Sequence, residues 1–280
     1  MLDHHPRILV AGCGYTGARC ADFFSAEGFA VTGLVSSEAS AAKLAGKPYP
    51  VIAADAADPS RVRALRDTLG RPDALVHCLS GHGGRDPAAY RVTYVETLRN
   101  LLDALVPKFI VFTGSVSVYP QNDGSNVSEE SPAGGTPTGD VLLEAEKLAL
   151  DAGGAVVRLG GIYGPGRCRF LQAILPGGAP APGTGDRSIN LIHRDDAASA
   201  LAHVARHRLA GVYNAVDDRP DRRSALAAAV TGLPPGPAHG PATGKRVDNA
   251  KLRSTGWAPR YPSIMDAWRD DEDLRSSLGQ

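Results

Sequence analysis

Apolar runs of strand length alternate with amphipathic helical segments between Ile8 and Leu159. The first run is short and continuous and leads into glycine, which is typical of a strand that is buried on both faces. Alternation of this kind predicts a parallel sheet with helices on both faces. The expected strands are Ile8–Ala11, Ala30–Val35, Val51–Ala53, Ala74–Leu79, Phe109–Thr113 and Ala155–Leu159, and the expected helices are roughly Thr16–Glu27, Glu38–Leu44, Pro59–Leu69, Pro87–Leu105 and Asp140–Leu150.

Two of the expected helices begin with an Asp-Pro pair, at Asp58-Pro59 and at Asp86-Pro87. An Asp side chain at the N-cap accepts hydrogen bonds from N–H groups that have no partner within the helix. Proline fits the first helical position, because its missing N–H is not needed there. We therefore expect helices to begin at these two prolines.

The alternation loosens after about Pro165, where Pro and Gly crowd the stretches Leu175–Gly185 and Gly232–Gly244. Such stretches are typical of loops that run over a surface or a cleft. No segment has the composition of a linker between independent domains. We therefore predict one domain over residues 1–280, with cap segments at about 165–190 and 217–262.

Charge and cysteine content exclude several classes of protein. The 280 residues include 30 basic and 30 acidic side chains, so no net field would attract nucleic acid or an anionic membrane, and neither is expected as a partner. No segment has the apolar length of a signal peptide or a membrane span. The cysteines contain no CxxC pair, so no metal site is expected, and most lie in apolar segments, which suits reduced thiols in the cytoplasm. They are Cys13, Cys20, Cys78 and Cys168.

The segment RILVAGCGYTGARCADFF predicts a strand, a glycine-rich turn and a helix at the start of the chain. In this context GxGxxG indicates a Rossmann-type site for a dinucleotide. The first glycine permits the tight turn, the second lets the backbone approach the pyrophosphate, and the third lets the helix pack on the strand. The N-terminus of the helix would hold the phosphates. The expected contacts are Gly12, Gly14, Tyr15, Thr16 and Gly17.

The end of the second expected strand bears on the choice of cofactor. In folds of this kind an acidic residue there binds the 2′-hydroxyl of the adenosine ribose of NAD. Here the strand runs into Ser36 and Ser37, with Glu38 next and no acid at the strand end itself. The two hydroxyls could bond the 2′-phosphate of NADP, or they could cap the following helix. NAD and NADP both stay open, with a slight preference for NADP and with Ser36 as the candidate contact.

Two further strand ends supply candidate cofactor contacts. Asp55 follows the third strand, where the adenine is expected, and could alternatively be a turn or capping residue. The segment LSGHGG follows the fourth strand and should lie over the cofactor, since its glycines permit a close approach of the backbone. The contacts expected from this segment are Leu79, Ser80 and Gly81.

Four later segments, FIVFTGSVSVYP, AVVRLGGIYGPGR, INLIHRDDAASAL and GVYNAVDDRP, add to the glycine loop. Together and in this order, they resemble the extended short-chain dehydrogenase/reductases, specifically the NAD-dependent epimerase/dehydratase group. The resemblance implies a doubly wound parallel Rossmann sheet of about seven strands with a small C-terminal substrate cap. It also implies a small-molecule substrate that has a carbonyl or hydroxyl group or is similar to a nucleotide sugar.

The chain departs from this family at the catalytic residues. The resemblance implies a Ser, which Ser115 matches, and a YxxxK pair whose Tyr exchanges a proton while the Lys lowers the Tyr pKa. The helix over Thr136–Leu150 matches the YxxxK helix and puts Thr138 at the Tyr position and Leu142 at the Lys position. Neither side chain can take over the missing function.

His82, in the loop after the fourth strand, is the remaining candidate proton donor, because histidine changes protonation near neutral pH. The alternative, which a lone loop histidine favours, is a solvated residue without a catalytic role. Two functions follow from these residues. One is an atypical NAD(P)-dependent oxidoreductase or epimerase/dehydratase-like enzyme that uses Ser115 with a non-standard proton donor. The other is a catalytically inactive dinucleotide-binding sensor or regulatory protein. The substrate and the oligomeric state, a homodimer included, stay open.

Overall fold

The computed structural model describes residues 5–81, 86–168, 187–220, 222–231 and 243–277. The chain divides into two compact units, each made of several segments. Unit 1 comprises Met1–Val118, Gly134–Arg158 and Ala198–Val212, and unit 2 comprises Tyr119–Ala133, Leu159–Ala197 and Tyr213–Gln280.

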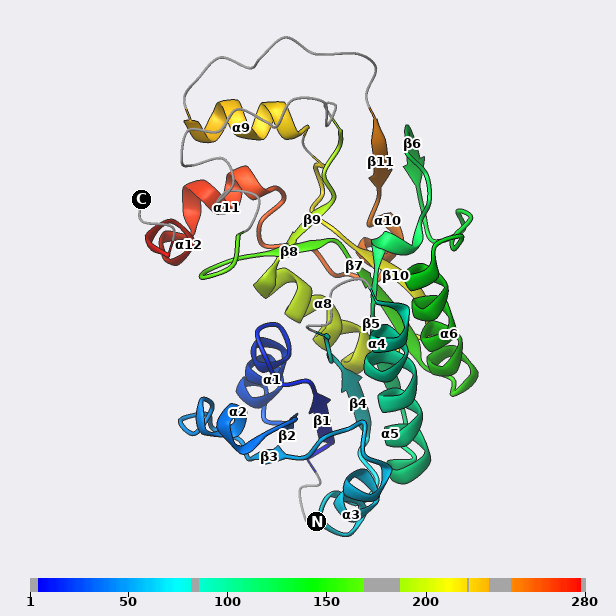
Figure 1. The fold of residues 1–280 in the computed structure, drawn as a ribbon. Helices are drawn as coiled ribbons and strands as arrows, with labels where there is room; N and C mark the ends of the chain where they lie inside the picture. The colour runs from blue at the N-terminus through cyan, green and yellow to red at the C-terminus, as the bar shows by residue number, and fades with distance from the viewer. Residues whose placement is uncertain (1–4, 82–85, 169–186, 221, 232–242, 278–280) are drawn as a thin grey trace. The chain divides into compact units, whose positions relative to one another are not determined.

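A seven-stranded sheet has the order β10-β7-β5-β4-β1-β2-β3 (Figure 1). The pairings among β1 to β5 are all parallel, and the order reverses beside β1, with β2 and β3 on one side and β4 and β5 on the other. The predicted doubly wound parallel sheet is therefore confirmed. Its strands are β1 (Arg7–Ala11), β2 (Ala30–Val35), β3 (Val51–Ala53), β4 (Ala74–His77), β5 (Ile110–Ser115), β7 (Ala155–Leu159) and β10 (Gly211–Ala215).

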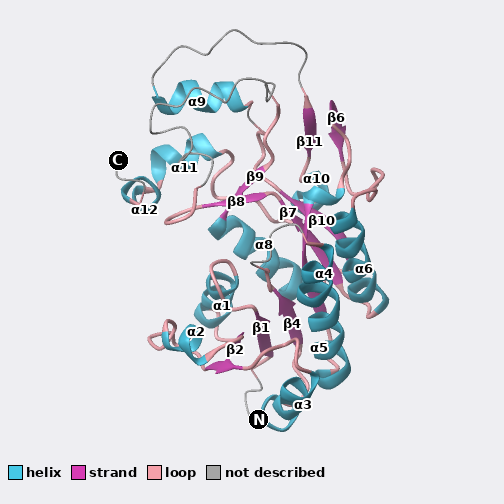
Figure 2. Ribbon diagram, in the orientation of Figure 1, coloured by secondary structure: helices cyan, strands magenta, loops and turns pink. Residues whose placement is uncertain are grey.

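Helices connect successive strands of the sheet (Figure 2). Asp58 accepts hydrogen bonds from the backbone N–H groups of Ser60 and Arg61, and Asp86 accepts them from the two residues after Pro87. Both predicted helix starts are confirmed. The helices are α1 (Gly17–Ala26), α2 (Glu38–Ala42), α3 (Pro59–Leu69), α4 (Pro87–Tyr90), α5 (Thr97–Leu105), α6 (Pro137–Asp151) and α8 (Arg194–His207).

The prediction of one continuous α-helix over residues 87–105 is wrong. Between α4 and α5, the segment Arg91–Glu96 is π-helical, and the Thr97 N–H bonds to the carbonyl of Val92, five residues back. We call this segment the π turn. The Thr97 hydroxyl donates to the carbonyl of Thr93 and is itself bonded to His77 from β4. The predicted fourth strand is also shorter than expected, since it ends at His77.

Unit 2 contains two small parallel sheets and short helices around its own core. Of the stretches predicted as loops, residues 175–185 and 232–242 lie outside the described residues. Its strands are β6 (Asp123–Val127) paired with β11 (Gly244–Val247), and β8 (Gly161–Tyr163) paired with β9 (Leu191–His193). Its helices are α9 (Arg223–Thr231), α10 (Ala250–Arg253), α11 (Ile264–Asp270) and α12 (Glu272–Ser276). The core cluster consists of Tyr163, Cys168, Leu226, Tyr261, Ile264, Ala267 and Leu274.

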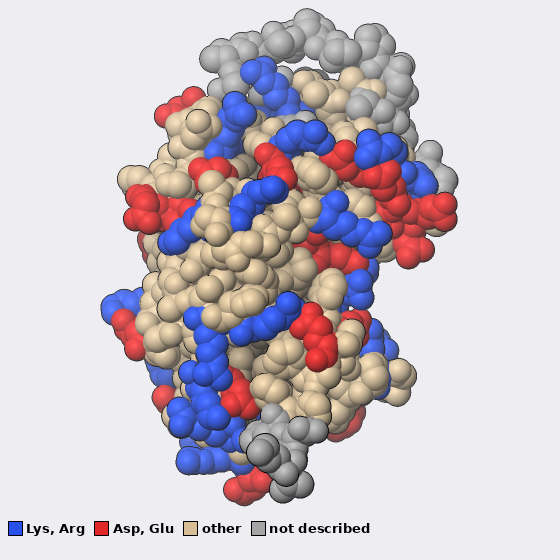
Figure 3. All heavy atoms as spheres, turned by 180° about the vertical axis from the view of Figure 1, so that it is seen from behind, with Lys and Arg blue, Asp and Glu red and all other residues tan. Residues whose placement is uncertain are grey.

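Basic and acidic side chains are both spread over the face seen in Figure 3. Mixed charge of this kind fits the formal net charge of zero. None of the helices in the described ranges combines the length and the apolar character that crossing a bilayer requires.

Candidate functional site

The glycine loop between β1 and α1 is packed too closely for side chains at two positions. Gly12 has a φ of +83°, and a Cβ there would lie 2.5 Å from backbone atoms of Cys78 and Leu79. A Cβ at Gly17 would lie 2.2 Å from the carbonyl oxygen of Gly12. The first glycine therefore joins the loop to the segment after β4, and the third brings α1 onto the turn.

Gly14, by contrast, faces open space. A Cβ there would meet nothing within 4 Å, and the residue is exposed. The loop runs directly into α1, because the Gly14 carbonyl accepts the N–H of Ala18. Thr16, the N-cap residue of α1, makes no side-chain cap bond within the described residues. The loop thus combines free space with the polar start of a helix, which fits a phosphate group.

The other candidate contacts lie at the carboxyl ends of neighbouring parallel strands. Ser36 follows β2 and Asp55 follows β3, whereas residues 79–81 follow β4 and Ser115 ends β5. Parallel strands bring these ends to one edge of the sheet, and ligands bind there at the point where the strand order reverses. The glycine loop is at that point.

The polar residues after β2 and β3 differ in what they contact. Ser37 caps α2 by accepting the N–H of Ser40, so its oxygen is engaged. Ser36 is exposed and does not cap the helix. Asp55 is also exposed, and its carboxylate accepts the N–H of Ala57 in a local turn. The turn alternative for Asp55 is therefore present in the structure, and Ser36 is the hydroxyl left facing solvent.

Ser115 is half-buried at the end of β5. Its Oγ accepts the backbone N–H of Ser117 at 3.1 Å, and among the described residues no group accepts its hydroxyl proton. The hydroxyl can therefore still donate to a ligand. His82, the other catalytic candidate, lies outside the described residues.

A buried ion pair packs against the strand just before Ser115. Arg158 from β7 contacts Glu146 from α6 with its Nε at 3.0 Å and its Nη2 at 2.6 Å. A Cβ at Gly114 would lie 2.9 Å from the Glu146 carboxylate, so a larger residue there would displace the ion pair. Burial raises the pKa of Glu146, and Arg158 opposes that rise. The pair therefore packs against the residue that precedes Ser115 on β5.

The thiols near the glycine loop are not reactive groups. Burial raises the pKa of Cys13 to about 11 and that of Cys78 to about 12, and it raises the pKa of Cys20 as well. All three therefore stay protonated at neutral pH, and the thiolate is the reactive form. They act as packing residues around the turn.

A family model described as the NAD dependent epimerase/dehydratase family matches residues 8–215. The chain belongs to this family. A Methylobacillus flagellatus protein assigned as an NAD-dependent epimerase/dehydratase is 30% identical, with a TM-score of 0.81 over 98% of this chain and 99% of that chain. No curated protein matches the sequence significantly.

Two solved epimerases share the fold at lower identity. UDP-glucose 4-epimerase of Thermotoga maritima, solved with UDP-glucose, is 19% identical with a TM-score of 0.75 over 98% of this chain and 97% of that chain. UDP-glucose 4-epimerase of Thermus thermophilus, solved with NAD, is 19% identical with a TM-score of 0.74 over 98% of each chain. At this identity, the comparison establishes the fold alone.

Within this epimerase/dehydratase fold, the two positions matched to the family's Tyr and Lys lie one turn apart on α6. Thr138 is half-buried in the first turn of the helix, and Leu142 is only 3% exposed. Leu142 therefore belongs to the packed core. An unpartnered ammonium group at this position would therefore be costly to bury.

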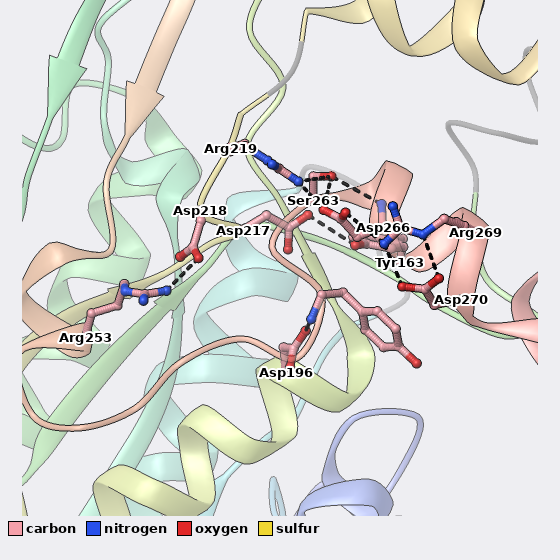
Figure 4. Close-up of polar contacts among 11 residues, drawn as sticks. Tyr163, Asp196, Asp217, Asp218, Arg219, Arg253, Ser263, Asp266, Arg269 and Asp270 are labelled. Carbon is pink, nitrogen blue, oxygen red and sulfur yellow. Dashed lines mark hydrogen bonds and ion pairs between the residues drawn. The ribbon is translucent and has the colours of Figure 1, made fainter.

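In the described part of unit 2, the carboxyl groups of Asp196 and Asp217 are buried, and Figure 4 shows both side chains. Tyr163 donates a hydrogen bond to Oδ2 of Asp217 at 3.2 Å, whereas Oδ1 has no partner within the described part of the chain. Asp196 accepts the backbone N–H groups of Arg260 and Tyr261. Burial raises the pKa of Asp196 to about 6, and burial together with nearby Asp196 raises the pKa of Asp217 well above its usual value.

Proposed function

We propose that the chain is an NAD(P)-dependent oxidoreductase or epimerase/dehydratase-like enzyme that acts on a small molecule with a carbonyl or hydroxyl group. The observation that carries this proposal is the glycine loop. Its first and third glycines are packed against backbone, while the space over Gly14 is open beside the start of α1. This is the arrangement that a pyrophosphate requires.

The bound dinucleotide would supply hydride transfer, and the chain's residues would bind and orient the reactants. The glycine loop would hold the pyrophosphate, and Ser115 would donate its hydroxyl proton to the substrate oxygen as a hydrogen bond. No residue at positions 138 and 142 can take or give the proton that accompanies hydride transfer. A proton donor outside the usual pair is therefore part of the proposal, and His82 is the candidate.

The finer choice of cofactor and substrate follows from the strand ends and the relatives. An exposed Ser36 and the lack of an acid at the end of β2 favour NADP slightly over NAD. A structural relative was solved with UDP-glucose, which supports a nucleotide-sugar-like substrate as one class.

A second candidate function is a catalytically inactive dinucleotide-binding sensor or regulatory protein. The observation that favours it is the burial of Leu142, which makes the lysine position part of the core. The two functions differ in one measurable respect, because both require dinucleotide binding but only the enzyme turns over a substrate.

Dinucleotide binding is tested with Gly14→Val. A branched side chain at this position would fill the space for the pyrophosphate, so the Kd for NADH and NADPH should rise more than about tenfold. Nicotinamide fluorescence titration measures both affinities. Gly46→Val is the matched control, since Gly46 also has nothing within 4 Å but lies outside the loop. Equal affinity in Gly14→Val and the parent would refute the assignment of the loop.

A further inference from the structure

The π turn between α4 and α5 is stabilised by a side chain and not by the backbone alone. In an α-helix the N–H of Thr97 would bond to the carbonyl of Thr93, but here it bonds to Val92. The Thr97 hydroxyl donates to the carbonyl of Thr93 at 2.5 Å. This side-chain bond keeps Thr97 attached to Thr93 although the Thr97 N–H bonds to Val92.

His77, the last residue of β4, holds that hydroxyl in place. Its Nε2 lies 2.9 Å from Thr97 Oγ1, and both side chains are buried. Because the hydroxyl already gives its proton to Thr93, it can only accept from His77, so Nε2 carries the hydrogen. Burial lowers the pKa of His77 to about 3, so the ring stays neutral at physiological pH.

The same turn contacts the loop that follows β4. A Cβ at Gly81 would lie 2.8 Å from Thr93 Oγ1, so the loop backbone is seated directly on the π turn. Burial raises the pKa of the Tyr94 phenol in the π turn, and the Gly81 backbone partly opposes that rise. At its other end the loop is seated on the glycine loop, where Gly12 meets Leu79. The loop is thus held between the glycine loop and the π turn.

The strand order places this loop on one half of the cofactor site. The glycine loop follows β1, and the residues for the adenosine half follow β2 and β3 on one side of it. The loop at residues 79–81 follows β4, on the opposite side. A dinucleotide that crosses the reversal point would therefore place its nicotinamide half over β4 and β5.

We propose that Thr97, held by His77, is a positioning residue for the nicotinamide half of the dinucleotide. Its hydroxyl keeps the π turn in the register in which Thr93 contacts Gly81. That contact fixes the backbone of residues 79–81 beside the ligand. This inference rests on the proposed dinucleotide binding. A return to the α register removes one residue from the turn, and one residue corresponds to a rotation of about 100°. That rotation would move Thr93 away from Gly81.

The test compares a whole dinucleotide with the half that does not reach this loop. Thr97→Val removes the hydroxyl and keeps the shape of the side chain. We expect the Kd for NADH to rise about tenfold, as for one lost hydrogen bond. The Kd for ADP, which spans only the adenosine side and the pyrophosphate, should change less than about twofold. Thr97→Ser restores the hydroxyl and should restore NADH affinity.

Asp73→Asn is the control for general destabilisation. Asp73 precedes β4 at its opposite end, where its carboxylate accepts the N–H of Arg7 and pairs with Lys108. This variant should lower the melting temperature and leave both Kd values unchanged. If Thr97→Val does not fold, His77→Phe is measured instead, because it removes the donor to the same hydroxyl.

Two results would overturn the inference while leaving the proposed function intact. One is that the parent binds NADH and the Thr97→Val variant binds it with the same affinity. The other is a parallel loss of NADH and ADP affinity, which would mean that the variant damages the whole site. A parent that binds neither NADH nor NADPH would instead refute the proposed function, and the inference with it.

Discussion

Ser36 and Ser37 stand side by side after β2 and differ in what their hydroxyls contact. The Ser37 oxygen is bonded to the N–H and hydroxyl of Ser40 and so belongs to the cap of α2. Ser36 is exposed and plays no part in the cap. The first residue after the strand meets the adenosine ribose in folds of this type, so we predict that a charge at Ser36 alters cofactor choice.

Ser36→Asp should shift the preference from NADPH toward NADH. A carboxylate there repels the 2′-phosphate and accepts a hydrogen bond from a free 2′-hydroxyl, so the ratio of the two Kd values should move about tenfold or more. Ser37→Asp is the matched control, because Asp also caps a helix and adds the same charge one residue further on. An unchanged ratio in Ser36→Asp would place ribose recognition elsewhere, with Glu38 the next candidate.

At the scale of elements, α6 combines three features that bear on catalysis. Thr138 lies in its first turn, Leu142 lies in the core one turn later, and Glu146 forms the buried pair with Arg158 after a further turn. Residues spaced by four share one face of a helix. The face that matches the family's YxxxK pair is therefore present, but it carries an alcohol and an apolar side chain.

The double variant Thr138→Tyr with Leu142→Lys should raise turnover above the parent and above either single variant. A tyrosine alone keeps a pKa near 10, whereas a cation one turn away makes the phenolate accessible. General acid–base catalysis is typically worth about 10²–10⁴-fold. Leu142→Lys alone should cost on the order of 3 kcal/mol of stability, since it buries a charge without a partner. Hydride transfer with a panel of carbonyl and sugar-nucleotide substrates is followed by nicotinamide absorbance.

The controls for this prediction are Ser115→Ala and His82→Ala in the parent and in the double variant. If positioning depends on the β5 hydroxyl, Ser115→Ala should reduce the activity of the double variant. Strong activity in the parent that survives Ser115→Ala and is lost in His82→Ala would contradict the account. It would mean that a histidine has taken over the proton transfer.

At the scale of the whole chain, local patterns predicted the elements whose cause is local. The strand at Ile8–Ala11 is a continuous apolar run, and its residues are at most 4% exposed. Its sequence pattern and its burial therefore agree. The start of α3 follows from Asp58 and Pro59, which act within one turn. The glycine turn was predictable for the same reason, because the turn and the start of α1 lie within a few residues.

What could not be predicted depends on contacts between residues far apart in sequence. Next to the π turn, Thr97 contacts His77, which lies 20 residues earlier in the sequence. Nothing in the amphipathic pattern of residues 87–105 marks the extra residue in the turn. Within the described residues, Oδ1 of Asp217 is buried without a hydrogen-bond partner. That environment depends on tertiary packing, which no local pattern predicts. Sequence therefore predicted the sheet, the glycine turn and the helix that follows it, but not the side chains that pack against them.

Unit 2 should become less stable as pH rises, and the buried carboxyls are the main reason. Both Asp217 and Asp196 have a raised pKa in the folded chain, whereas an unfolded Asp titrates near 3.9. Above that value the folded state binds more protons than the unfolded state, so stability falls with rising pH through the folded pKa, which for Asp196 is about 6. His193 acts oppositely, because burial lowers its pKa. Tyr163 and Asp218 are the other titratable groups that act on Asp217.

Asp217→Asn should remove part of this pH dependence, because the amide resembles the protonated acid and stays neutral at every pH. At pH 4 the variant and the parent should melt at similar temperatures. At pH 8 the variant should melt about 2–8 °C higher, which corresponds to about 1–2 kcal/mol for a chain of this length. Contributions from Asp196 and His193 are present in both proteins and largely cancel in the difference. Asp218→Asn is the control, because this neighbouring carboxylate pairs with Arg253. It should not raise the melting temperature at pH 8. A variant of Asp217 that melts lower than the parent at pH 8 would contradict this account, because it would mean that the ionised carboxylate stabilises the fold.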